Sequence, residues 1–260
     1  MDAGRGEMME VQIRLENIGH SFPETGHVLD GISLNVKQGE FVSLIGPSGS
    51  GKSTIFNTIG GLLQPDRGDI YLEGRRVNGE TGNIAYMPQQ PTLLPWRTVL
   101  HNVILAQELT GKPDVGEGKK WLAKVGLGDY ESAFPHQLSG GMKQRATFIR
   151  AMLCPQQVLL LDEPFSALDE FTRFDMQKWL LSVWEEKRKS VLFITHNIEE
   201  ALFLSDRIYL LSPRPGKVIK EFEIPFPRPR ADGLLLENQF LQMKREIYAT
   251  LREGGVHEGH

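Results

Sequence analysis

The sequence predicts an α/β fold with a helical subdomain inserted into the α/β core. Short apolar runs that suit β-strands recur along the chain, and segments with helical spacing separate them. Strands that are apolar on both faces are typical of sheets covered by helices on both sides. Residues 92–155 show helical patterns and no clear strand. We therefore expect one domain over residues 10–260, a helical subdomain at about 92–155, and flexible ends at 1–9 and 252–260.

The individual elements follow from local patterns. Alternating apolar and polar residues predict a half-buried strand at VQIRLENI, and short apolar runs predict buried strands at 40–46, 157–164 and 190–196. Helical spacing predicts helices from the glycine-rich stretch at 51 onward, from 142 to Pro155, at 172–187 and at 234–251. The proline-rich segments 213–216 and 224–230 are expected to be turns or edge segments.

Composition argues against a nucleic-acid-binding, disulfide-linked, membrane-spanning or secreted protein. The 260 residues carry a net charge of −4, which gives no reason to expect nucleic acid as a partner. One cysteine, Cys154, cannot form a disulfide within the chain, and this fits a reducing compartment. No apolar run reaches the ~20 residues of a membrane-spanning helix, and the N-terminus lacks a signal-peptide pattern. We expect a protein that stays inside the cell and meets a membrane only through other chains.

A phosphate-binding loop is predicted at GPSGSGKST, which matches G-x-x-x-x-G-K-[ST] between a strand pattern and a helix pattern. Glycines let backbone N–H groups close on phosphate oxygens, and the positive end of the following helix points at the anion. Lys52 can reach the β- and γ-phosphates, and the Ser53 hydroxyl can bind Mg²⁺. The predicted P-loop comprises Gly46, Pro47, Ser48, Gly49, Ser50, Gly51, Lys52, Ser53 and Thr54.

Two acidic residues end a buried strand in QVLLLDEP. Ligands of open α/β sheets bind at the carboxyl ends of strands, which is where Asp162 and Glu163 are expected. Asp162 can hold Mg²⁺ through water, and Glu163 can orient or deprotonate a water that attacks the γ-phosphate. Together with the P-loop, these residues predict a P-loop NTPase.

A second glycine turn, Leu138-Ser139-Gly140-Gly141, precedes a helical pattern, and it resembles the signature of ABC-transporter ATPases. Further landmarks of that family follow in its order over residues 10–225, so the resemblance is specific. It implies an aromatic on adenine for Phe22, although a core role is equally open, and Q-loop, D-loop and switch roles for Gln89, Ser166–Asp169 and His196. Gln89 would contact Mg²⁺ and the water site, and Asp169 would belong to the nucleotide site.

The resemblance implies a head-to-tail homodimer that holds each ATP between the P-loop of one copy and Ser139, Gly140 and Gly141 of the other. It also implies two transmembrane permease subunits, an external substrate-binding protein reached through them, and a place at the cytoplasmic face of the membrane. Leu93, Leu94 and Trp96 resemble the surface that receives the permeases, with ordinary packing as the alternative.

Several details resemble the nitrate/sulfonate/taurine-type import ATPases, and thiamine-precursor importers share this type. These are Met142 after the signature and the fragment LSPRPGKVIKEFEIPFPRPR. Asn197 stands where aspartate is more usual in the wider family, which raises the question of its hydrogen bonds. Three alternatives stay open: a soluble ABC ATPase acting on nucleic acid or translation, another P-loop enzyme, and an exporter ATPase. The transported compound is not encoded in this chain.

Overall fold

The computed structural model of the protein describes residues 11–166 and 168–256 and confirms the predicted α/β fold. Residues 1–9, Ala167 of the predicted D-loop and residues 257–260 lie outside this part, whereas residues 252–256 continue the last helix. Contacts divide the chain into a first unit, residues 1–84 with 190–260, and a second unit, residues 85–189.

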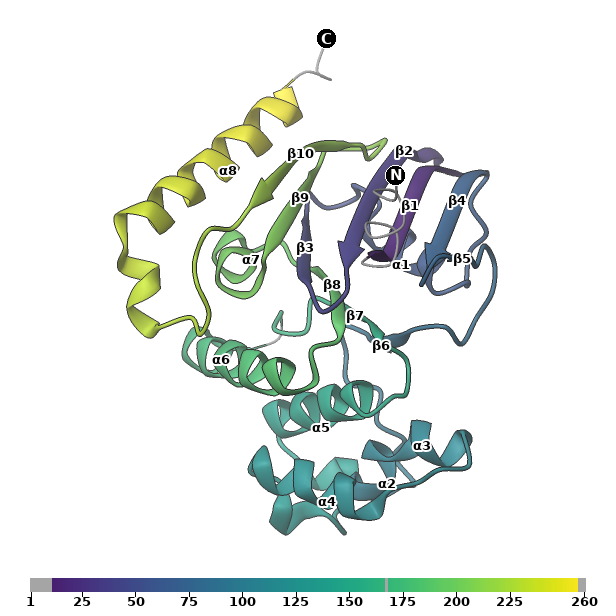
Figure 1. Ribbon diagram of the computed structural model, residues 1–260, viewed down its shortest axis with the longest axis vertical. Helices are drawn as coiled ribbons and strands as arrows, with labels where there is room; N and C mark the ends of the chain where they lie inside the picture. Colours follow the sequence, from purple (N-terminus) through teal and green to yellow (C-terminus); the bar gives the residue numbers. More distant parts are fainter. Residues whose placement is uncertain (1–10, 167, 257–260) are drawn as a thin grey trace, which may run out of the picture. The chain divides into compact units, whose positions relative to one another are not determined.

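The first unit contains a parallel sheet with an antiparallel edge, in the order β10-β9-β3-β8. Its strands are β3 (Phe41–Ile45), β8 (Ser190–Ile194), β9 (Arg207–Leu211) and β10 (Val218–Glu223). Every residue of β3, β8 and β9 is buried, as predicted for β3 and β8 from their continuous apolar runs. The helices of this unit are α1 (Lys52–Ile59), α7 (Ile198–Leu204), η3 (Asp232–Leu236) and α8 (Asn238–Val256) (Figure 1).

The first unit also holds an antiparallel sheet in the order β2-β1-β4-β5, of which only the first strand was predicted. Its strands are β1 (Val11–Phe22), β2 (Gly26–Lys37), β4 (Arg67–Leu72) and β5 (Arg75–Arg76). Register shifts interrupt the pairing of β1 with both neighbours. Because a bulge breaks strict alternation, this sheet leaves a weaker pattern in the sequence than the buried strands do.

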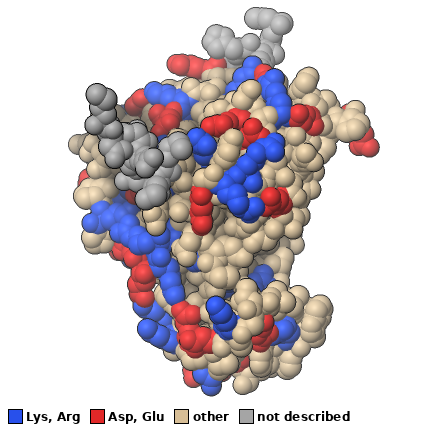
Figure 2. Space-filling model, turned by 45° about the vertical axis from the view of Figure 1, so that its right-hand side comes forward, with Lys and Arg blue, Asp and Glu red and all other residues tan. Residues whose placement is uncertain are grey.

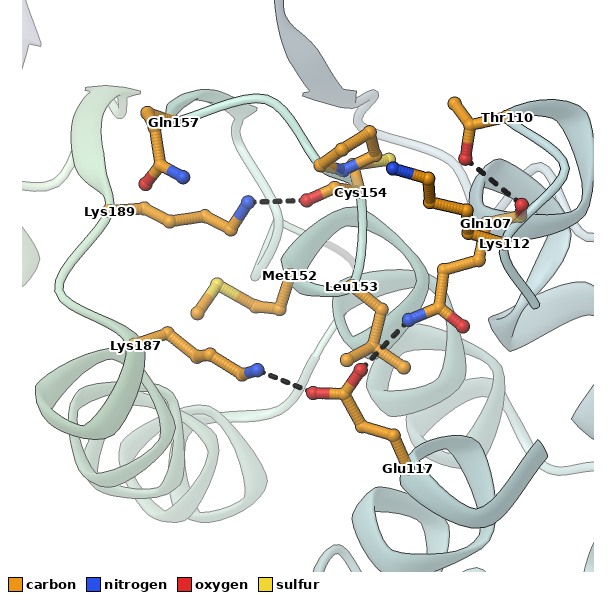
Figure 3. Close-up of a pocket in the computed structure, with 11 residues that line it drawn as sticks. Gln107, Thr110, Lys112, Glu117, Met152, Leu153, Cys154, Gln157, Lys187 and Lys189 are labelled. Atoms are coloured by element: carbon orange, nitrogen blue, oxygen red, sulfur yellow. Dashed lines mark hydrogen bonds and ion pairs between the residues drawn. The ribbon is translucent and has the colours of Figure 1, made fainter. Parts of the chain in front are cut away.

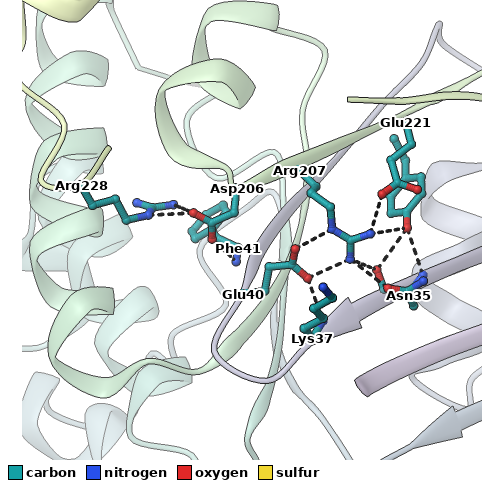
Figure 4. A network of polar contacts seen from close by, with 9 residues as sticks. Asn35, Lys37, Glu40, Phe41, Asp206, Arg207, Glu221 and Arg228 are labelled. Atoms are coloured by element: carbon teal, nitrogen blue, oxygen red, sulfur yellow. Dashed lines mark hydrogen bonds and ion pairs between the residues drawn. The ribbon is translucent and has the colours of Figure 1, made fainter. Parts of the chain in front are cut away.

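The two sheets of the first unit are joined by Arg207 of β9, a buried residue (Figure 4). Its guanidinium donates to Glu40 Oε1 at 2.5 Å, to Glu221 Oε1 at 2.6 Å and to the carbonyl of Asn35 at 2.9 Å. Asn35 belongs to β2 and Glu221 to β10, so one side chain connects the antiparallel sheet with the edge of the parallel one.

The second unit pairs β6 (Ala85–Met87) with β7 (Val158–Asp162) in parallel. Its helices are α2 (Val99–Val103), α3 (Leu105–Leu109), α4 (Val115–Lys124), η1 (Gly128–Tyr130), η2 (Pro135–Gln137), α5 (Gly140–Met152) and α6 (Glu170–Lys187). The stretch 92–155, all of it described, contains helices and no strand. The compact unit is larger than this stretch, because β6, β7 and α6 also belong to it.

Candidate functional site

The glycine-rich loop between β3 and α1 has the backbone that a phosphate cradle requires. Gly51, the residue before α1, has φ +88°, and a Cβ there would lie 2.4 Å from Leu29 Cδ2. Glycine is therefore required by conformation and by space. Ser50 N–H donates to the Pro47 carbonyl at 3.3 Å and closes the turn. The first N–H groups of α1 have no partner within the helix and face the loop's end, an arrangement that suits an anion.

Lys52 lies inside this loop, with only 8% of its surface exposed. Its Nζ donates to the carbonyl oxygens of Gly46 and Pro47 at 2.8 and 2.9 Å. These bonds hold the ammonium over the loop, where its charge would complement an anionic ligand. The hydroxyl-bearing Ser53 follows on α1 and is exposed.

The proline-rich segment 213–216 packs against the same loop, which the sequence did not predict. A Cβ on Gly216 would lie 2.1 Å from the Ser50 carbonyl oxygen, so the segment touches the loop backbone. Arg214 donates to the carbonyls of His27, at 2.9 Å, and of Thr25. The segment therefore holds both the phosphate loop and the turn between β1 and β2.

Phe22 lies at the end of β1, beside that turn, and pairs with Gly26. Its ring meets His20 edge to face, with centroids 4.7 Å apart. The Phe22 side chain is half-buried, so part of the ring stays accessible for stacking.

His196 lies two residues after the end of β8 and is exposed. The next residue, Asn197, caps α7: its side-chain oxygen accepts from Glu199 N–H at 2.8 Å and Glu200 N–H at 3.3 Å. Asparagine caps a helix as well as aspartate does, so the departure from the family pattern keeps this bond. The Thr195 hydroxyl donates to Glu200 Oε2 at 2.5 Å, which fixes the backbone on the other side of His196.

The second unit brings Gln89 and Glu163 together. Gln89 Nε2 donates to Glu163 Oε2 and to Ser166 Oγ, both at 3.2 Å. Glu163 has φ +42°, a left-handed backbone that is uncommon for a residue with a side chain. Residues with strained backbones cluster at functional sites, so this conformation makes Glu163 a candidate functional residue.

Asp162, at the end of β7, accepts a hydrogen bond from the Tyr86 hydroxyl at 3.1 Å. Burial, and then the charge and hydrogen bond of Asp162, raise the pKa of Tyr86 far above its ordinary value. The phenol thus remains a donor at neutral pH and orients the carboxylate. Tyr86 was not predicted as a site residue; its position on β6, three residues before Gln89, was the available signal.

The predicted signature lies at the start of α5. Ser139 is the N-cap, and its Oγ accepts from Met142 N–H at 3.3 Å. A Cβ on Gly140 or Gly141 would meet no atom within 4 Å among the described residues. The packing of this chain therefore gives no reason for two glycines here, whereas close approach of an outside ligand would.

Side chains of α5 connect the signature helix to two predicted site segments. Gln144, buried, donates to the Pro164 carbonyl in the turn after Glu163. Arg150 donates to the Thr92 carbonyl at 2.7 Å and to its hydroxyl at 2.6 Å. Neither residue was predicted, because such long-range bonds leave no local pattern.

Asp169 lies at the N-cap of α6, where its carboxylate accepts from Thr172 N–H at 3.1 Å. Hydrogen bonds from Thr172 lower the pKa of Asp169 below its ordinary value.

Among the helices that the structure describes, none has the length and apolar character of a membrane-spanning segment.

Comparison with known proteins gives matches over most of the chain. The family described as "ABC transporter" matches residues 29–166. The chain is 38% identical to an aliphatic sulfonates import ATP-binding protein of Bacillus cereus, over 89% of this chain and 91% of the relative. It is 40% identical to a taurine import ATP-binding protein of Rhizobium johnstonii (88% and 91%). It is 39% identical to a formylaminopyrimidine import ATP-binding protein of Halalkalibacterium halodurans (95% and 98%).

Among solved structures, the chain resembles an ATP-binding cassette determined as a dimer in a post-hydrolysis state bound to ADP and Pi. The two share 30% sequence identity with a TM-score of 0.71, and the match covers 83% of this chain and 100% of that one. These findings confirm the resemblance predicted from the motifs.

Proposed function

This chain belongs to the ABC transporter family of ATP-binding proteins, and we propose that it is the ATP-hydrolysing subunit of an ABC importer. The observation that carries the proposal is the pair of anion-binding turns. One is the loop that ends at Gly51, and the other is the start of α5, where a Cβ on Gly140 or Gly141 would meet no atom within 4 Å among the described residues.

ATP binding would use the P-loop and Phe22. Backbone N–H groups of the loop, Pro47 excepted, would surround the phosphates, and Lys52 would exchange its carbonyl partners for phosphate oxygens. The adenine would stack on Phe22, whose ring is partly accessible.

Hydrolysis would be carried by Glu163, Gln89 and His196. Glu163 would accept a proton from the attacking water or orient it, and the hydrogen bond from Gln89 supports this position of its carboxylate. His196 would contact the γ-phosphate, and the cap at Asn197 supports a fixed backbone at that point. Such general base catalysis typically contributes about 10²–10⁴-fold to the rate.

A Mg²⁺ ion would be held by Ser53, Gln89 and Asp162 together with phosphate oxygens. Hydroxyl, amide and carboxylate oxygens are the donors that Mg²⁺ prefers. The amide nitrogen of Gln89 faces Glu163 and Ser166, which leaves its oxygen as the ligand atom. When bound, the ion would neutralise charge that develops on the phosphates.

The signature would complete the nucleotide site of a second copy. Ser139 and the N–H groups of Gly140 and Gly141 stand at the N-terminus of a 13-residue helix, where an anion is favoured. Two turns per chain would form two complete sites in a symmetric dimer, with Asp169 near each. ATP would then favour the closed dimer, and loss of the γ-phosphate would release it.

The partners would be two permease subunits, which would keep the chain at the cytoplasmic face of the membrane and reach an external substrate-binding protein. Trp96 supports this surface, because 73% of it is exposed, whereas Leu93 and Leu94 are half-buried. The bonds from Arg150 to Thr92 offer a route from the signature helix to this segment.

The cargo class rests on the relatives, which are named for aliphatic sulfonates, taurine and formylaminopyrimidine. We infer a small anion or organic solute of that kind. Figure 2 shows Lys and Arg interspersed with Asp and Glu on the face it draws, a distribution that does not favour a nucleic-acid partner.

The experiment that tests the function measures steady-state ATP hydrolysis with Mg²⁺ for the wild type, Glu163→Gln and a control, Glu223→Gln, at an exposed position of β10. We expect Glu163→Gln to lose ~10²-fold or more of the rate while it still binds ATP, and the control to keep full activity. Near-normal turnover of Glu163→Gln would exclude its assigned role, and absence of hydrolysis in the wild type would refute the function itself.

A further inference from the structure

A pocket of about 350 Å³ opens in the second unit (Figure 3). None of the residues assigned above to nucleotide, metal or partner binding lines it. The lining residues come from α3 to α6 and their connections: Gln107, Thr110, Lys112, Glu117, Met152, Leu153, Cys154, Pro155, Gln157, Lys187 and Lys189.

Positive charge exceeds negative charge in this pocket, since three lysines and one carboxylate line it. Lys187 Nζ pairs with Glu117 Oε1 at 2.5 Å, and Glu117 also accepts from Gln107 at 2.8 Å. Lys112 forms no ion pair with any residue that the structure describes. The lining therefore carries two positive charges that no lining carboxylate neutralises.

Of the two lysines without a carboxylate partner among the described residues, Lys112 and Lys189, Lys189 is the buried one, with only 5% of its surface exposed. Its Nζ donates to the carbonyls of Cys154 and Gln156 at 2.6 and 2.5 Å, and within the described part of the chain no carboxylate pairs with it. Burial is the main reason that the pKa of Lys189 falls to about 8. The hydrogen-bond partners of this ammonium are carbonyl oxygens, so an anion of fitting shape placed beside it would gain a favourable charge interaction.

The uncharged part of the lining is mixed, with Gln107, Thr110 and Gln157 beside an apolar portion. Figure 3 shows Met152 and Leu153 between Lys187 and Lys189 on one side and Gln107 and Lys112 on the other. Pro155 extends this apolar surface. A ligand that used the whole pocket would therefore combine an anionic head with a short hydrocarbon part.

We propose that this pocket is a second ligand site, which binds a small organic anion with a sulfonate or carboxylate head and a short apolar chain. The head binds between Lys112 and Lys189, and the chain covers Met152 and Leu153. Binding here needs neither the phosphate loop nor the signature, so the site is independent of the proposed ATPase function.

The lone cysteine supplies a local reporter, since Cys154 lines the pocket and the chain has no other cysteine. The wild-type chain is treated with sulfonatoethyl methanethiosulfonate, which is anionic, and separately with its trimethylammonium analogue, which is cationic. Each rate, followed by mass spectrometry, is divided by the rate for free cysteine. The proposal predicts a preference of tenfold or more for the anionic reagent. Equal normalised rates would overturn it.

Variants and competitors then test the ligand chemistry. Lys112 is exposed, so Lys112→Glu should fold, and it should lower the preference several-fold; Lys220→Met, a paired surface lysine of the first unit, should leave it unchanged. Butanesulfonate should slow modification of Cys154, whereas butyltrimethylammonium and sodium chloride at equal ionic strength should not. Protection by sulfate as strong as by butanesulfonate would contradict the apolar part of the site.

The pH dependence gives a separate readout. The charged groups that line the pocket with Lys189 are Lys112, Lys187 and Glu117, and the thiol is Cys154. As pH rises through about 8, Lys189 loses its proton and its attraction for the anion. Protection by butanesulfonate, expressed as a ratio of rates at each pH, should therefore fall between pH 7 and 9. Constant protection over that range would exclude Lys189 from the site.

Discussion

At the scale of single residues, Glu163 combines an unusual backbone with a fixed side chain. A residue other than glycine at φ +42° costs of order 1–3 kcal/mol unless its surroundings enforce the conformation. The surroundings here include the Gln89 hydrogen bond and the turn in which Ser166 N–H donates to the Glu163 carbonyl at 3.1 Å. These bonds fix the position of the carboxylate, which suits the general base that we propose.

Cys154 allows a prediction about reactivity. Burial raises the pKa of its thiol, and the nearby charges of Lys189 and Arg150 do not offset this effect. Because the thiolate is the nucleophile, alkylation by neutral iodoacetamide at pH 7.5 should be about tenfold slower than for free cysteine. Mass spectrometry across pH 7–10 should give a midpoint above the ordinary ~8.5. A midpoint at or below that value would contradict the burial of the thiol.

The contiguous motifs lie where their local pattern predicts, since Gly51 and Ser139 each directly precede a helix. Their proposed roles use the backbone N–H groups, so spacing along the chain was enough to predict the segments. Tyr86, Gln144 and Arg214 were missed because each acts on a partner distant in sequence, and such pairs depend on the fold.

At the scale of elements, α7 is held at both ends, and the helix begins one residue after Asn197 and two after His196. At its C-terminal end, Arg230 donates to the carbonyls of Leu202 and Ser205 at 2.6 and 2.7 Å. Beside it, Arg228 donates to Asp206 Oδ1 at 2.9 Å (Figure 4). The motif PRPR thus completes the last turn of the helix that follows the proposed switch histidine.

Loss of the Asn197 cap of α7 should change the free energy of unfolding by a measurable amount. Asn197→Ala removes the acceptor for two N–H groups and should lower the free energy of unfolding by about 0.5–2 kcal/mol. Asn197→Asp keeps a side-chain oxygen at the same place and should retain the stability of the wild type. Urea unfolding followed by circular dichroism measures both, and equal stability of the alanine and aspartate variants would contradict the cap.

Loss of the Arg230 hydrogen bonds at the C-terminal end of α7 should lower the free energy of unfolding by more than loss of the N-cap does. The reason is that Arg230 is buried and carries a charge. Arg230→Met leaves carbonyls of α7 without their donor, and hydrogen bonds to charged groups contribute about 1.5–3 kcal/mol. We expect the free energy of unfolding to fall by about 2 kcal/mol or more. Arg245→Met, at an exposed position of α8, is the matched control and should change little. If the two variants are equally stable, the Arg230 hydrogen bonds do not stabilise α7.

The sequence predicted strands correctly where burial alone determined their composition. The continuous apolar runs of β3, β7 and β8 reflect burial, and they lie within one or two residues of the predicted ranges. The antiparallel sheet was largely missed because β1 pairs through bulges and β5 has only two residues. The final helix starts at Asn238, four residues after its predicted start, because Asp232–Leu236 form a separate 3₁₀ turn.

At the scale of the whole molecule, the proposed nucleotide site is complete only with a second copy of the chain. A Cβ at either signature glycine would meet no atom within 4 Å among the described residues, and a helix N-terminus favours an anion. ATP shared between two copies would give both proposed anion-binding turns a role. Binding energy would then become a change of assembly state, because ATP would bind the closed dimer better than the separate chains.

The measurement that tests this claim most directly is the mass of Glu163→Gln in solution, by light scattering, with and without ATP and Mg²⁺. Slow hydrolysis in this variant should preserve the closed state. We expect the mass to rise from that of one 29.3 kDa chain to about twice that value when ATP is added. Adding Gly141→Asp, which places a carboxylate at the signature, should abolish the rise. A mass that stays at one chain with ATP bound would contradict the shared site.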